Sequence, residues 1–216
     1  MRTTDVVIIG GRGNGTAVQA AIEAAAHAGQ SVSVLGFLND GGADSLDGSP
    51  VLDRLSPESV GRFLQRPSTN FVWALTSSSL REDSKKRFES LKIPKERLQT
   101  IVDPSAFVSR TAKLGSGVVV HAFSYIAPGA SIGGNSVIWP HTLIGTNAVL
   151  GEFSYVAANA SVGASATLAE GAYLGMNAVA RERTHLGYWS VAGMGAVVIK
   201  PVEDFQTVVG NPARPI

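Results

Sequence analysis

Residues 138–161 read IWPHTL-IGTNAV-LGEFSY-VAANAS, four consecutive hexads that each begin with a branched aliphatic residue. The same step of six runs without a gap from Val102 to Val198, and its positions are Val, Leu or Ile apart from two Ala. Position five of each hexad is small or Val, while positions two and four are often Gly or Asn, which suit sharp corners. The repeat predicts short strands that coil into a solenoid with one aliphatic and one small side chain inward per hexad.

Length and composition exclude several classes of protein. The chain has 216 residues, of which 44% are hydrophobic and 16% charged, so neither a disordered nor a membrane-spanning chain is expected. With a net charge of +1, the protein has no overall electrostatic attraction to nucleic acid or to an anionic lipid surface. The absence of cysteine excludes disulfides, thiolate metal sites and a Cys nucleophile. The first residues lack the layout of a signal peptide, so we expect a cytoplasmic protein.

The first hundred residues have a different pattern. The apolar run 6–9 enters the glycine-rich turn Gly10-Gly11-Arg12-Gly13, which is followed by an Ala-rich stretch. The later pattern predicts these elements in order: helix 16–27, strand 31–37, helix 57–64, strand 71–75 and helix 79–91. Such alternation predicts a small α/β domain with a parallel sheet, and a glycine turn between strand and helix can bind a phosphate. We expect two domains, the α/β domain over residues 1–100 and the hexad-repeat domain over residues 101–216.

The joined features resemble the sialic acid O-acetyltransferase-like family of hexapeptide-repeat sugar acyltransferases. Besides the coil, the resemblance rests on these motifs: Ile8-Ile9-Gly10-Gly11-Arg12-Gly13, Gly36-Phe37-Leu38-Asn39-Asp40, Asp103-Pro104-Ser105-Ala106, Gly193-Met194-Gly195-Ala196-Val197-Val198 and Gly210-Asn211-Pro212-Ala213-Arg214. It implies a Rossmann-like parallel-sheet domain followed by a left-handed parallel β-helix with three hexads per turn, assembled as a homotrimer.

The resemblance also implies an activity, the transfer of an acetyl group from acetyl-CoA to a nucleotide-linked sugar in surface polysaccharide or glycan synthesis. The nucleotide-sugar would contact the first glycine turn with its phosphates and the residues after the second strand with its base; the implied and candidate substrate-binding residues are Gly10, Gly11, Arg12, Gly13, Asn39, Asp40, Tyr155 and Ala164. Acetyl-CoA would lie along the coil, and its implied contacts are Gly175, Gly193, Gly195, Lys200 and Arg214.

One departure from the family pattern concerns the mechanism. The family usually places a catalytic His followed by an acidic residue at positions three and four of one hexad, and an ungapped count puts Thr146 and Asn147 there. Neither residue is a general base near pH 7. Three explanations remain: His141 supplies the base from a neighbouring corner, the acceptor is an amine that needs no strong base, or the site is not catalytic and the protein only binds its ligands.

We favour the second explanation, in which the acceptor is an amine. A sugar amine with a pKa of about 8 is partly free at pH 7, whereas an alcohol is almost entirely un-ionised. Thr146 or Asn147 would orient the amine and a backbone amide near Ala164 would stabilise the oxyanion. The alternatives are O-acetylation with His141 as base and a non-catalytic nucleotide-sugar or CoA-binding relative. The spacing of His121, His141 and His185 contains no close pair typical of a zinc site, so no metal is expected. His121, at position two of its hexad, and His185, at position six, are expected to be exposed strand or corner residues.

Overall fold

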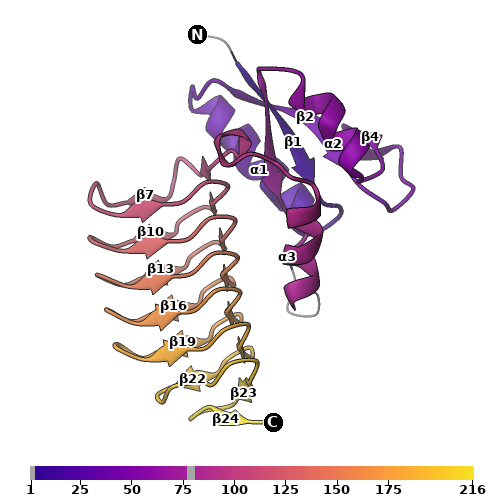
Figure 1. Ribbon diagram of the computed structural model, residues 1–216. Helices are drawn as coiled ribbons and strands as arrows, with labels where there is room; N and C mark the ends of the chain where they lie inside the picture. Colours follow the sequence, from indigo (N-terminus) through magenta and orange to yellow (C-terminus); the bar gives the residue numbers. More distant parts are fainter. Residues whose placement is uncertain (1–2, 77–80) are drawn as a thin grey trace. The chain divides into compact units, whose positions relative to one another are not determined.

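The computed structural model describes residues 3–76 and 81–216 (Figure 1). The chain divides into two compact units, Met1–Ile101 and Val102–Ile216.

The first unit contains a five-stranded sheet in the order β3-β4-β2-β1-β5. The strands are β1 (Thr4–Ile9), β2 (Val32–Leu38), β3 (Ser45–Leu46), β4 (Ser49–Asp53) and β5 (Thr69–Trp73). All pairs are parallel except β3 with β4. The core of this sheet is apolar because its central strands are runs of buried aliphatic and aromatic residues. The expected Rossmann-like sheet is confirmed, with the hairpin β3–β4 as an addition that the sequence pattern did not predict.

The helices of this unit are α1 (Asn14–His27), α2 (Pro57–Leu64), α3 (Arg81–Ser90) and the short 3-10 helix η1 (Lys95–Arg97). Helix α2 has the predicted bounds because Ser56 caps its N-terminus in a capping box with Ser59, and Pro57 fits the first helical position. Strand β5 begins and ends two residues earlier than predicted. The predicted start of the third helix falls in 77–80, outside the described residues.

The strand order creates a topological switch point. From β1 the chain crosses to β2 on one side, and β5 then pairs with the other side of β1. The turn that leaves the carboxyl end of β1 therefore lies where open α/β sheets characteristically bind their ligands. This turn is the glycine-rich segment 10–13.

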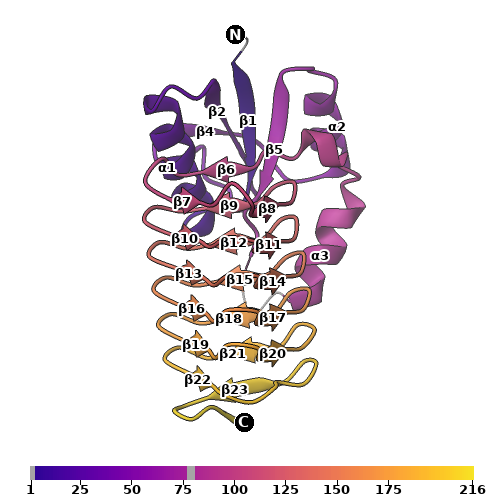
Figure 2. The same cartoon turned by 90° about the vertical axis from the view of Figure 1, so that its left-hand side faces the viewer.

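The second unit is a parallel β-helix (Figure 2). Its three faces are named here after their first strands. The β6 sheet comprises β6 (Ile101–Val102), β9 (Val119–Val120), β12 (Val137–Ile138), β15 (Tyr155–Val156), β18 (Tyr173–Leu174), β21 (Val191–Ala192), β23 (Thr207–Val209) and β24 (Arg214–Pro215). The β7 sheet comprises β7 (Phe107–Val108), β10 (Tyr125–Ile126), β13 (Leu143–Ile144), β16 (Ser161–Val162), β19 (Val179–Ala180) and β22 (Val197–Val198). The β8 sheet comprises β8 (Lys113–Leu114), β11 (Ser131–Ile132), β14 (Val149–Leu150), β17 (Thr167–Leu168) and β20 (His185–Leu186).

From β7 to β22 the paired residues are eighteen positions apart, as in Ile126 with Ile144 and Ile144 with Val162, so one coil contains three hexads. The last coil is shorter, since Val191 pairs with Thr207. The aliphatic residue at position one and the small residue at position five of most hexads form a continuous buried core. This is the arrangement that the hexad pattern predicted.

The glycines of the coil have two structural roles, and the expected corner role covers only one of them. Every position-four residue from Gly117 to Gly195 has a positive φ, including His141 at 60° and Asn147 at 56°. The position-two glycines are not in that conformation. A Cβ at Gly145 would lie 2.6 Å from the amide nitrogen of Ala164 in the next coil, so these positions need glycine because two backbones approach closely.

Candidate functional sites

The turn at the switch point combines three features that favour an anion. Helix α1 begins at Asn14, its N-cap residue Gly13 makes no capping hydrogen bond through a side chain, and its first turn contains no acidic residue. Arg12 is exposed beside it and forms no ion pair with the described residues. The free amides and the positive end of the helix dipole therefore meet an unpaired guanidinium.

A pocket of about 310 Å³ lies at the carboxyl ends of β2 and β4. It is lined by Asn39, Asp40, Gly42, Ala43, Asp44, Val51, Asp53 and Arg54. Both members of the predicted base-binding pair, Asn39 and Asp40, line this pocket. The structure thus brings this pair next to the glycine turn. The side-chain nitrogen Nδ2 of Asn39 donates a hydrogen bond to the carbonyl oxygen of Gly10 over 3.0 Å.

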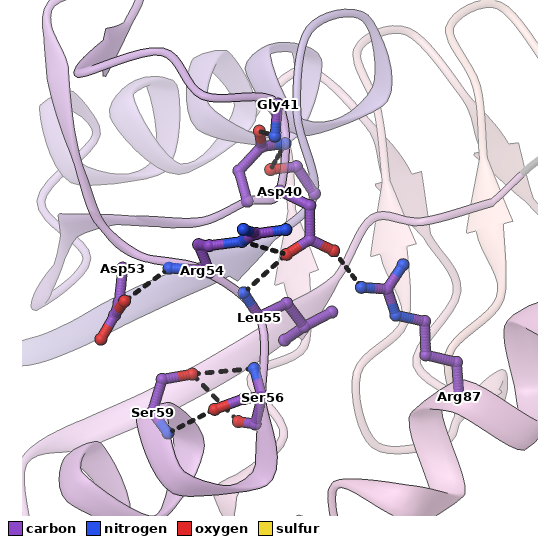
Figure 3. Close-up of polar contacts among 10 residues, drawn as sticks. Asp40, Gly41, Asp53, Arg54, Leu55, Ser56, Ser59 and Arg87 are labelled. Carbon is purple, nitrogen blue, oxygen red and sulfur yellow. Dashed lines mark hydrogen bonds and ion pairs between the residues drawn. The ribbon is translucent and has the colours of Figure 1, made fainter.

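The carboxylate of Asp40 is held from several sides (Figure 3). Arg87 of α3 donates to one oxygen, and the backbone N–H of Leu55 donates to the other over 3.1 Å. The Nε atom of Arg54 lies 3.9 Å from that second oxygen. Burial acts to raise the pKa of Asp40, but the hydrogen bonds from Arg87 and Leu55 and the charges of Arg87 and Arg54 keep it below its ordinary value. Arg87 was not among the predicted site residues, because it lies 47 positions from Asp40.

In the second unit, the structure separates His141 from Thr146 and Asn147. They lie in the same coil, at opposite ends of β13 (Leu143–Ile144). We call the column of corners between the β6 and β7 sheets the first corner, which contains His141, and the column between the β7 and β8 sheets the second corner, which contains Thr146 and Asn147.

The second corner presents a small polar group on an exposed backbone. Thr146 is exposed, and its hydroxyl has no hydrogen-bond partner among the described residues. The side chain of Asn147 lies over Gly129 of the preceding coil, where a Cβ would come within 2.1 Å of its Oδ1. Ala164 follows Thr146 by one coil, and its N–H is likewise unpaired in the described chain. This corner therefore contains a hydroxyl, a carboxamide and a free backbone donor.

His141 occupies the first corner as an exposed ring. Its φ is 60°, its N–H donates to the carbonyl of Ala122 over 3.0 Å, and its imidazole stacks on Phe123 with ring centroids 5.1 Å apart. The corner conformation and the stacking contact account for this residue without a contact to Thr146.

The predicted CoA contacts divide between two places. Gly175, Gly193 and Gly195 lie at the first corner in the later coils. Lys200 and Arg214 lie together in a pocket of about 250 Å³ at the carboxyl end of the coil, beside Val198, Val202 and Val208. The two cations thus share one cavity with the apolar end of the core.

An aromatic ladder crosses four coils on the β6 sheet. It consists of His121, Trp139, Tyr155 and Tyr173, with neighbouring ring centroids 4.7 to 5.9 Å apart. Burial and, to a lesser degree, Tyr173 raise the pKa of Tyr155. Because Tyr155 belongs to the β6 sheet, it lies away from the second corner, which joins the β7 and β8 sheets and contains Thr146 and Ala164.

His121 corrects an expectation, since its hexad position predicted an exposed residue. It is 5% exposed, stacks on Trp139, and its Nε2 has no hydrogen-bond partner among the described residues. Burial lowers its pKa to about 4, although the charge of Asp103 acts in the opposite direction. The imidazole is therefore neutral at pH 7.

This burial predicts an acid-sensitive stability. Between the ordinary pKa of about 6.5 and the folded value of about 4, the unfolded chain binds the proton and the folded chain does not, so stability is lost as pH falls. At pH 5 the loss from this residue is about 2 kcal/mol. Denaturant unfolding followed by circular dichroism should show that His121→Phe, which keeps the stacked ring, removes this part of the loss between pH 7 and pH 5. An identical pH dependence in the two proteins would contradict the assignment.

Comparison with known proteins shows what the chain resembles. The family described as bacterial transferase hexapeptide (six repeats) matches residues 111–146. The acetyltransferase domain of PglB from Neisseria gonorrhoeae FA1090 is 25% identical, with a TM-score of 0.82, over 99% of this chain and 100% of that chain. A search of curated protein sequences finds no match. The expected resemblance to hexapeptide-repeat sugar acyltransferases is thereby confirmed.

Two further solved structures share the fold. One is a variant of perosamine N-acetyltransferase from Caulobacter crescentus in complex with CoA and GDP-perosamine, which is 24% identical with a TM-score of 0.66 over 98% of this chain and 96% of that one. The other is WeeI from Acinetobacter baumannii AYE, 21% identical with a TM-score of 0.58 over 99% and 100% of the two chains.

No helix in residues 3–76 and 81–216 is long and apolar enough to cross a membrane. Nor does the same part of the chain contain a group of three or more His, Cys, Asp or Glu side chains arranged to hold a metal ion.

Proposed function

We propose that this protein transfers an acetyl group from acetyl-CoA to the amino group of a nucleotide-linked amino sugar, in the cytoplasm, as a step of surface polysaccharide or glycan synthesis. The observation that carries the proposal is the likeness to the acetyltransferase domain of PglB, which spans both units and 99% of this chain. Of two structures with the same fold, the perosamine N-acetyltransferase variant contains CoA and GDP-perosamine, and a second structure of the PglB domain contains acetyl-CoA. The glycine turn at the switch point is suited to bind the phosphates of a nucleotide-linked substrate, which supports the proposal.

The second corner supports direct attack by the amine. The free amine adds to the thioester carbonyl carbon, the carbonyl oxygen becomes an oxyanion, and the carbon–sulfur bond then breaks as the CoA thiolate leaves. The nitrogen loses one proton to solvent or to the thiolate. Thr146 and Asn147 orient the amine, and the unpaired N–H of Ala164 donates to the oxyanion. The chain contains no cysteine, and no acyl-enzyme is required.

Lys200 and Arg214 are suited to the phosphates of acetyl-CoA. They line the pocket at the carboxyl end of the coil, together with apolar residues. Two cations in one cavity provide charge-assisted hydrogen bonds to an anionic ligand. Gly175, Gly193 and Gly195 have no side chain beyond Cα, which gives pantetheine access to the backbone of the first corner. The exposed side chains of Met176 and Met194 lie at the same corner and offer it apolar contacts.

The outer face of the β7 sheet favours assembly of the chain as a homotrimer. Its outward side chains are apolar except for Ser161, and four of them, Phe107, Tyr125, Leu143 and Val179, are each at least 40% exposed. The outward positions of the β8 sheet are mostly polar: Lys113, Ser131, Val149, Thr167 and His185. An exposed apolar stripe beside a polar face is typical of a subunit interface. The second corner with Thr146 borders this stripe, so the neighbouring subunit would cover the site.

This assignment predicts different effects of one substitution at two matched positions. Leu143 of the β7 sheet is 44% exposed and Val149 of the β8 sheet is 47% exposed. Leu143→Lys places a charge in the interface and should convert the trimer to monomers, whereas Val149→Lys should leave the trimer intact. Sedimentation velocity distinguishes the two. A wild-type monomer, or two variants that assemble equally well, would contradict the interface.

CoA binding tests the proposed function without knowledge of the sugar. Isothermal titration of the wild-type protein with CoA should give saturable binding, and Lys200→Gln with Arg214→Gln should weaken it at least about tenfold. Arg110→Gln, an exposed arginine in the first hexads of the coil, serves as the control and should bind as the wild type does. Failure of the wild-type protein to bind CoA would overturn the enzyme proposal.

A further inference from the structure

Asn39 lies against the glycine turn and follows β2 directly. Because β1 and β2 are parallel neighbours, their carboxyl ends adjoin, and the N–H of Gly10 donates to the carbonyl of Leu38 over 3.2 Å. The carboxamide of Asn39 then makes two hydrogen bonds. Its Nδ2 donates to the carbonyl of Gly10 over 3.0 Å, and its Oδ1 accepts from the N–H of Gly41 over 2.6 Å.

The same carboxamide fills the space that Gly11 leaves open. A Cβ added at Gly11 would lie 2.3 Å from Nδ2 of Asn39, a distance that only displacement of the amide could relieve. Gly11 and Asn39 therefore fit each other as a pair. A larger residue at 11 would push the carboxamide away from Gly10 and Gly41.

An aspartate at position 39 has nearly the same shape as asparagine but lacks the donor. Its carboxylate would face the carbonyl oxygen of Gly10, which only accepts hydrogen bonds, so the contact would be repulsive. It would also place a negative charge beside the uncapped N-terminus of α1 and the unpaired Arg12. Both effects oppose the binding of an anion at this turn.

We propose that Asn39 is a positioning residue that holds the Gly10–Gly13 turn in the conformation that receives the diphosphate of the substrate, and that it does not read the nucleobase. This inference rests on the proposed function. The carboxamide of Asn39 donates one hydrogen bond to Gly10 and accepts one from Gly41, which fixes its orientation toward the turn. The neighbouring Asp40 is held by Arg87 and Leu55 (Figure 3). The pair thus fixes the shape of the phosphate turn and of the loop that follows β2.

Titration of GDP, UDP and dTDP into the wild-type protein and its variants tests the proposal. On the diphosphate that binds most tightly, Asn39→Asp should weaken binding about tenfold or more, and the loss should shrink as salt screens the added charge. In turnover assays the KM for the nucleotide-sugar should rise while the KM for acetyl-CoA stays unchanged. A general defect in folding would not produce either the salt dependence or the selective change in KM.

Asn70→Asp is the matched control. Asn70 donates to Oε1 of Gln99 over 3.0 Å and pairs with Val6, toward the amino end of the parallel strands and away from the turn. This variant introduces the same charge in the same unit and should bind the diphosphate within about twofold of the wild type.

A double substitution tests the pairing of Gly11 with Asn39. Gly11→Ala alone should weaken diphosphate binding, and so should Asn39→Ala; the double variant should be no weaker than Asn39→Ala alone because the collision is gone. If Asn39→Asp does not fold, Asn39→Ala and the double variant carry the test. Wild-type affinity in Asn39→Asp, or strictly additive losses, would overturn this inference alone. Absence of binding of all three diphosphates to the wild-type protein would overturn the nucleotide-sugar function itself.

Discussion

A nucleotide-linked amino sugar is expected to be acetylated at least about 10³-fold faster than the same sugar with a hydroxyl in place of the amine. The reason lies at the second corner, where Thr146 and Asn147 occupy the positions at which the family usually has a catalytic His and an acidic residue. An amine with a pKa of about 8 is already one-tenth unprotonated at pH 7, whereas a hydroxyl needs a base that this corner lacks. The ratio of kcat/KM for the two acceptors measures the effect.

The pH dependence of the same reaction and a substitution at His141 test the unassisted amine. With the amine as nucleophile, kcat/KM should rise with pH up to about 8, the pKa of the amine. His141→Asn should keep the rate within about twofold, since Asn adopts the positive φ of this corner readily. Equal rates for both acceptors, or a loss of about 100-fold in His141→Asn, would favour O-acetylation with His141 as base.

The substitution Gly145→Asn is expected to destabilise the coil by about 3 kcal/mol or more. A Cβ at Gly145 would lie 2.6 Å from the amide nitrogen of Ala164 and 2.8 Å from the carbonyl carbon of Gly163. Both are backbone atoms of the next coil, and they cannot move aside without breaking the hydrogen bond from Gly145 N–H to the carbonyl of Val162, which is 2.8 Å long. Denaturant unfolding followed by circular dichroism measures the change.

Gly195→Asn is the matched control for that substitution. Gly195 has a φ of 68°, and nothing lies within 4 Å of an added Cβ. Asparagine already occupies the same hexad position with positive φ at Asn135, Asn159 and Asn177. We expect a change within about 0.5 kcal/mol. If the two variants were equally stable, the distinction between the close-approach glycines and the corner glycines would be wrong.

The sequence predicted the coil well because its hexad repeat is local and is repeated through every turn. Helix α2 was predicted to the residue for the same kind of reason, since Ser56 and Pro57 mark its start within the chain itself. The position-two glycines were assigned to corners because their requirement comes from a backbone one coil away, which no local pattern reveals. The hairpin β3–β4 was missed because its strands are short and its turn, Asp47-Gly48, lies in a polar stretch.

The candidate sites were less predictable, since they depend on contacts between distant residues. Counting hexads placed Thr146 and Asn147 at one corner and His141 at the neighbouring one, but it did not predict the stacking of His141 on Phe123 of the preceding coil. His121 was expected to be exposed, and its burial follows from stacking on Trp139, one coil further on. The role of Asn39 depends on Gly10 and Gly11, and that of Asp40 on Arg87; these partners come from separate elements of the fold.

Release of the CoA thiol is the decisive measurement for acetylation of an amino sugar. Wild-type protein is incubated with acetyl-CoA and a panel of GDP-, UDP- and dTDP-linked amino sugars, and the free thiol is followed alongside mass spectrometry of the sugar. If the protein acetylates an amino sugar, thiol release should depend on the amino sugar and should equal the amount of amide formed. Thiol release that occurs only with hydroxyl acceptors, or none with any amino sugar despite binding of both ligands, would contradict it.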